Sequence, residues 1–100
     1  MLDSRQRAYL RGLANPLDSL FQIGKGGLSD TACVQFDEAL TARELIKVRI
    51  LRTAAEDART IADAVAEQVG ADVVSLVGRV FVLYRASPKL RKEGRSLRLP

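Results

Sequence analysis

The sequence contains no histidine, no tryptophan and only one cysteine, Cys33. Without histidine the chain lacks both the commonest metal ligand and the usual general base near neutral pH. A single cysteine excludes an intramolecular disulfide and any metal site built from cysteine pairs. The sequence also offers no activated nucleophile. We therefore expect no catalytic residue, no metal site and no cofactor, and we predict that the protein is not an enzyme.

Long apolar runs are also missing. No stretch of the chain is long and apolar enough to cross a bilayer. The first ten residues carry Asp3, Arg5 and Arg7 and contain no apolar run, which is not the pattern of a signal peptide. These observations predict a cytoplasmic protein without a membrane segment.

The positive charge is unevenly distributed along the 100 residues. The net charge is +4, and residues 86–100 account for all of it, because five basic residues there face only Glu93. The five are Lys89, Arg91, Lys92, Arg95 and Arg98. A basic tail favours nucleic acid or another polyanion, although a purely solubilising tail has the same composition. We expect one folded domain over residues 1–86 and a basic flexible tail over residues 87–100.

Hydrophobic periodicity predicts seven elements in the order helix, strand, helix, strand, helix, strand, strand. The expected strands cover residues 19–23, 45–51, 72–77 and 79–85. The expected helices begin near Asp3 or Ser4, near Ser29, and at a capping box formed by Thr53 and Glu56. Residues 80–84 are apolar on both faces, which indicates an inner strand. Together these elements predict an α/β fold, with a four-stranded mixed sheet and three helices.

The most unusual local feature is the segment Gly24-Lys25-Gly26-Gly27, which lies between an expected strand and an expected helix. Glycine lets another molecule approach the backbone closely, and a helix N-terminus is a favourable place for a phosphate. Lys25 adds a positive charge at the same place. This arrangement is typical of the GXXG loop of KH domains, which clamps an RNA backbone. A tight strand-to-helix turn that merely needs glycine is the alternative interpretation.

Two other phosphate-binding motifs do not fit this segment. The P-loop requires Gly-x-x-x-x-Gly-Lys-Ser/Thr, which the residues after Gly24 do not provide. The dinucleotide fingerprint requires a third glycine where this chain has Ser29. The loop therefore favours RNA over a mononucleotide or dinucleotide.

Other basic residues extend the candidate interface. Three of them, Arg5, Arg7 and Arg11, decorate the first helix, and Lys47 and Arg49 alternate with apolar residues in the second strand. From the tail we add Lys89, Arg91 and Lys92 as candidate contacts. The chain has only five aromatic residues and no stacking platform of the RRM kind, so we expect recognition of RNA shape and phosphate rather than base sequence.

Four stretches of the chain together resemble the CRM domain, the chloroplast RNA splicing and ribosome maturation domain, in its bacterial stand-alone YhbY-like form. They are residues 5–11 (RQRAYLR), 22–28 (QIGKGGL), 39–48 (ALTARELIKV) and 77–85 (VGRVFVLYR). The resemblance covers roughly residues 2–86, and the tail after Ser87 lies outside it. Asn15 departs from the family pattern, which has histidine there, but this position is not in the loop.

The resemblance implies a fold similar to the C-terminal domain of bacterial translation initiation factor three. It also implies RNA binding through the GxxG loop, here Gly24, Lys25, Gly26 and Gly27, and through the basic residues of the first helix. Bacterial members associate with precursors of the large ribosomal subunit. The expected partners are therefore ribosomal RNA and pre-large-subunit particles, and the expected role is ribosome assembly.

Two alternatives remain open from the sequence. One is an enzyme that uses the glycine loop to hold a small phosphorylated ligand, with Glu38, Glu44 and Asp72 as available acids. The other is a small adaptor whose basic tail docks on an acidic protein partner. The sequence does not indicate the oligomeric state.

Overall fold

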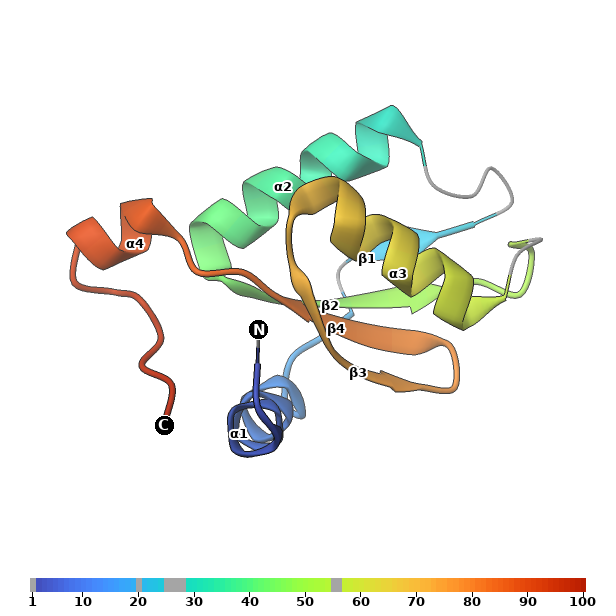
Figure 1. Cartoon of the computed structure of the whole chain (residues 1–100). Helices are drawn as coiled ribbons and strands as arrows, with labels where there is room; N and C mark the ends of the chain where they lie inside the picture. Colours follow the sequence, from blue (N-terminus) through green and yellow to red (C-terminus); the bar gives the residue numbers. More distant parts are fainter. Residues whose placement is uncertain (1, 20, 25–28, 55–56) are drawn as a thin grey trace.

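The computed structural model describes residues 2–19, 21–24, 29–54 and 57–100. Its elements are α1 (Ser4–Ala14), β1 (Phe21–Ile23), α2 (Asp30–Arg43), β2 (Leu45–Ile50), α3 (Ala58–Val69), β3 (Asp72–Val77), β4 (Val80–Tyr84) and α4 (Pro88–Lys92). The strands form one sheet in the order β1-β2-β4-β3 (Figure 1). β1 is parallel to β2, and β4 is antiparallel to both of its neighbours. This arrangement confirms the predicted four-stranded mixed sheet with β4 as an inner strand.

The sheet is covered on both faces (Figure 1). One face carries α2 and α3, and the opposite face carries α1. The alternation in β2 assigns its side chains to these two layers, because successive residues of a strand point to opposite faces. Ile46, Val48 and Ile50 pack under α2 and α3, whereas Leu45 packs under α1.

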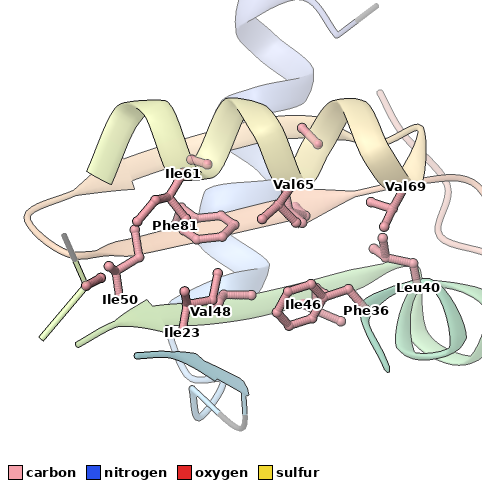
Figure 2. Packing of buried hydrophobic residues seen from close by; sticks show 14 residues of the cluster. Ile23, Phe36, Leu40, Ile46, Val48, Ile50, Ile61, Val65, Val69 and Phe81 are labelled. Atoms are coloured by element: carbon pink, nitrogen blue, oxygen red, sulfur yellow. The ribbon is translucent and has the colours of Figure 1, made fainter. Parts of the chain in front are cut away.

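The larger core lies between the sheet and the pair α2 and α3 (Figure 2). The side chains of two residues from each helix are almost completely buried there, against Phe81 of β4: Phe36 and Leu40 of α2, and Ile61 and Val65 of α3. The positions four residues apart in each helix bring these side chains onto one face. This core therefore holds the two helices whose N-termini follow the glycine loop and the β2–α3 connection.

A smaller core lies between the sheet and α1. Leu10 and Ala14 of α1 pack there with Val82 and Tyr84 of β4 and with other buried residues. Leu10 and Ala14, four residues apart, are both buried, whereas Leu17, just beyond the end of α1, is exposed. Because the opposite side of α1 remains in contact with solvent, Arg5, Arg7 and Arg11 are all exposed.

Side-chain caps fix where the helices begin. Asp3 forms a capping box with Gln6 at the start of α1, and Ser29 caps α2, both as expected. The predicted capping box of Thr53 and Glu56 is wrong, because α3 begins at Ala58 and Asp57 caps it with a 2.8 Å bond from Thr60 N. The helix begins later in the sequence than expected because a turn follows β2. In this turn Ala54 N donates to Leu51 O, and Ala54 is buried. Glu56 lies outside the described residues.

The segment after β4 also differs from the expectation. We expected no regular structure beyond Pro88, but residues 88–92 form α4, with Ser87 as its N-cap and the proline in its first turn. Leu90 is buried, and Leu97 and Leu99 pack against the smaller core. The expectation that no regular structure follows Pro88 is therefore wrong for residues 88–92. The apolar residues of this segment are too widely spaced in sequence to show a periodic pattern, yet they pack against the rest of the protein.

One buried carboxylate anchors this segment. Glu44 ends α2 in a left-handed conformation (φ 65°), and its side chain is completely buried. Its two oxygens accept hydrogen bonds from Ser87 N at 2.6 Å, Ser96 Oγ at 2.8 Å and Leu97 N at 2.6 Å. Burial alone raises the pKa of Glu44, but these bonds, with help from the nearby charge of Arg91, outweigh it and hold the pKa below its usual value. The ionised carboxylate thus ties residues 87–97 to the body.

We expect the Glu44→Gln substitution to reduce the free energy of unfolding at neutral pH by about 1.5–3 kcal/mol, the range for hydrogen bonds to a charged group. A folded-state pKa below the unfolded value gives stability that is complete above about pH 5 and is lost as pH falls through the folded pKa. Urea unfolding at several pH values should therefore show the difference from wild type shrinking in acid.

Glu93→Gln, at an exposed ion pair with Arg95, is the control and should show little difference at any pH. A Glu44 effect that is independent of pH would contradict this account.

Candidate nucleic-acid interface

The glycine loop begins at the carboxyl end of β1, where the parallel strands β1 and β2 end together. Leu51 N donates to Ile23 O at 2.8 Å, which fixes the chain after β2 beside the start of the loop. Gly24 is half-buried at this point, and α2 begins a few residues later, after Ser29. Carboxyl ends of strands in α/β sheets are common ligand sites. The predicted contacts Lys25, Gly26 and Gly27 lie outside the described residues.

Neither the backbone conformation nor the packing around residue 24 requires a glycine there. Its φ lies outside the left-handed region that favours glycine. A Cβ atom placed on it would lie 3.4 Å from Leu51 Cδ1 and 3.6 Å from Thr53 Oγ1, which are ordinary contact distances. At this position, therefore, the alternative of a turn that merely requires glycine has no conformational or steric support.

Three arginines line a hollow that shares the residue Leu51 with the surroundings of Gly24. Arg49 comes from β2, Arg52 from the segment after it, and Arg79 from the turn between β3 and β4. All three are exposed and line one hollow of about 240 Å³, which we call the arginine hollow. Its other walls are Ile50, Leu51 and Val80. Leu51 is thus both a wall of the hollow and the nearest side chain to Gly24. The sequence analysis named Arg49 as a candidate contact but not Arg52 or Arg79. These residues come together with Arg49 only through the pairing of β2 with β4.

A second hollow, of about 320 Å³, continues this surface toward α1. Arg11 and Lys47 line it together with residues of β3 and β4, and it shares the wall residue Val80 with the arginine hollow. Of the predicted α1 contacts, Arg11 therefore lies on the surface that leads to the glycine loop. For Arg5 and Arg7, nearer the start of α1, the structure shows only that they are exposed.

Lys47 has a structural partner. Its Nζ donates to the carbonyl oxygens of Ala14 at 3.3 Å, Asn15 at 3.4 Å and Leu17 at 3.3 Å. These carbonyls stand at and just beyond the end of α1, where the helix dipole favours a cation. Lys47 is also half-buried. Its charge is therefore used mainly to fix α1 on the sheet.

The predicted contacts in the tail lie elsewhere. Lys89, Arg91 and Lys92 are exposed on α4, which lies at the left of Figure 1, whereas β1 ends and α2 begins at the right. The tail cations on α4 thus lie at the other end of the sheet from the end of β1 and the start of α2.

Comparison with known proteins agrees with this fold. The sequence pattern of the CRS1 / YhbY (CRM) domain matches residues 2–85. The chain belongs to this family. Over 100 residues, the whole of both chains, it is 40% identical to the probable RNA-binding protein YqeI of Bacillus subtilis. It is 31% identical over 90 residues to a protein of Haemophilus influenzae named RNA-binding protein, covering 90% of this chain and 91% of that one.

A solved structure has the same CRM-type fold. The solution structure of the hypothetical protein SAV1595 from Staphylococcus aureus superposes with a TM-score of 0.80 at 37% identity, over the full length of both chains. This similarity extends beyond residue 85, where the family pattern stops, to the end of the chain. Among the residues described in this CRM protein, no helix is long and apolar enough to span a membrane.

Lys47 and Arg49 are two cations on the same side of β2 with different predicted roles. We expect Lys47→Gln to lower the free energy of unfolding by roughly 0.5–1.5 kcal/mol, because the α1 carbonyls lose their donor. Arg49→Gln should change it by less than about 0.5 kcal/mol, as for other surface substitutions. Urea unfolding monitored by circular dichroism measures both. Equal effects of the two substitutions would contradict this division of roles.

Proposed function

We propose that the protein binds structured RNA through the loop Gly24-Lys25-Gly26-Gly27 and the basic surface beside it, without catalysing a reaction on it. The observation that carries the proposal is the glycine at position 24, which neither backbone conformation nor packing requires. Close approach of another molecule is the remaining physical reason for a residue without a side chain. Two family relatives named RNA-binding proteins support RNA as that molecule.

The surroundings of Gly24 suit a phosphate backbone. The N-terminus of α2 follows the loop, and the first N–H groups of a helix have no partner within it. Lys25 in the loop and Arg11 on the adjoining surface add positive charge. Phosphate contacts of this kind depend on shape and charge, which agrees with the small number of aromatic residues.

We further propose that the RNA is large-subunit ribosomal RNA in precursor particles, so that the protein acts as a cytoplasmic assembly factor. This part rests on the family. Lys89, Arg91 and Lys92, exposed on α4, would then contact a more distant part of the same large RNA. Arg5 and Arg7 would add contacts along α1.

The first test is RNA binding as a function of salt, measured by fluorescence anisotropy with a labelled stem–loop from large-subunit ribosomal RNA. We expect the double variant Lys25→Ala, Gly26→Asp to bind much more weakly, because it loses a cation and gains an anion at the phosphate. Its salt slope should also be shallower by about one for each phosphate that the variant no longer binds.

The matched control is Arg43→Gln, Arg95→Gln, which lowers the net charge by the same two units at positions away from the loop. Circular dichroism establishes that every variant is folded. If the loop variant and the control bind equally well, the loop does not bind the RNA and this proposal fails.

Gly24→Ala tests the role of glycine more gently. We expect it to leave the free energy of unfolding within about 1 kcal/mol of wild type, because its Cβ meets only ordinary contacts. RNA affinity should fall nonetheless, since the added methyl group stands where the backbone would meet the ligand. Urea unfolding and anisotropy on the same samples separate the two effects. If Gly24→Ala is strongly destabilised, the glycine is required by the fold and its role is purely structural.

A further inference from the structure

The arginine hollow combines charges that repel one another. Arg49, Arg52 and Arg79 line a space of about 240 Å³, and no carboxylate is among the described residues that line it. In the described part of the chain the ion pairs are Arg59 with Asp63, Arg85 with Asp37, and Arg95 with Glu93, so none of the three arginines of the hollow takes part in one. Three cations gathered in this way form a strong positive potential.

The sheet fixes the backbone of two of these arginines, Arg49 and Arg79. Arg49 is opposite Val80 in the pairing of β2 with β4, and Ile50 N donates to Arg79 O at 2.7 Å. The Arg79 guanidinium in turn donates from Nη1 to Leu51 O at 3.4 Å. The backbone positions of Arg49 and Arg79 are therefore set by the strand pairing before any ligand binds. A preorganised site binds its ligand with a smaller entropic cost.

We propose that the arginine hollow binds a second backbone phosphate of the RNA strand that contacts the glycine loop. This inference rests on the proposed function and adds a site to it. Guanidinium groups present a planar fork of donors that matches two oxygens of a phosphate. Leu51 and Val80 supply apolar wall beside the fork, where a ribose ring can pack.

The position of the hollow favours a nucleic-acid strand over an isolated anion. Leu51 is the contact neighbour of Gly24 and also a wall of the hollow, so the two sites adjoin through one side chain. The shared wall Val80 continues the surface to Arg11. A strand that passes the glycine loop therefore meets the three arginines next and Arg11 beyond them.

The test uses the full chain, the labelled large-subunit stem–loop and the double variant Arg49→Gln, Arg79→Gln. We expect several-fold weaker binding than the control Arg43→Gln, Arg95→Gln, which has the same net charge. The salt slope should be shallower by about one for each phosphate that the variant no longer binds, whereas the control should keep the slope of wild type. Urea unfolding should show the control within about 0.5 kcal/mol of wild type. The hollow variant should stay within about 1.5 kcal/mol of wild type, because it loses the Arg79 bond to Leu51 O.

The outcomes separate this site from the loop. If the Arg49, Arg79 variant binds like the control while the loop variant Lys25→Ala, Gly26→Asp is weak, the hollow is not a phosphate site and the proposed function stands. If the hollow variant is weak and the loop variant binds normally, the hollow holds RNA and the loop part of the proposed function fails. A labelled polyglutamate is the second probe: binding as tight as that of RNA, with the same loss in the hollow variant, would overturn RNA as the ligand in favour of an acidic protein.

Discussion

The hydrogen bonds to the ionised carboxylate of Glu44 are the interactions that hold the C-terminal segment on the body of the protein. Glu44 stands at the junction of α2 and β2, and its backbone oxygen accepts a bond from Arg85 N at the end of β4. Its carboxylate meanwhile satisfies donors from Ser87, Ser96 and Leu97. A buried charge is tolerated only when such donors surround it, so the side chain and the C-terminal segment need one another. Removing either would leave unsatisfied polar groups in the interior.

Arg85 strengthens the same corner from the other side. Its guanidinium bonds to the Asp37 side chain at 2.6 Å, to Val69 O at 2.7 Å and to Thr41 Oγ1 at 2.9 Å. One residue after β4 thus fastens the end of α3 to the middle of α2. With Glu44 nearby, the end of the sheet opposite the glycine loop is rigidly cross-linked. At that end Arg85 has a structural role, whereas the three arginines of the arginine hollow are exposed.

Much of this fold could be predicted from local patterns, because each strand and helix shows its buried face within a few residues. The alternation of Ile46, Val48 and Ile50 is sufficient to assign β2, and the apolar run 80–84 identifies the inner strand. What could not be predicted depends on pairs distant in sequence. Arg49 and Arg79 meet only through the register of β2 with β4, and Leu97 reaches Glu44 across 53 residues. No local period records such pairs, so neither the arginine hollow nor the packed tail could be expected from the sequence.

The position of β4 has a consequence for how the chain acquires its structure. β4 is the last strand to leave the ribosome, yet it lies between β2 and β3. Until residues 80–84 emerge, β3 has no partner strand in the sheet and the inner edge of β2 is unpaired. Partial chains therefore expose open strand edges, which are prone to pair with other chains. Completion of the sheet is a late and cooperative event, and nearly the whole domain must be synthesised before its interior can close.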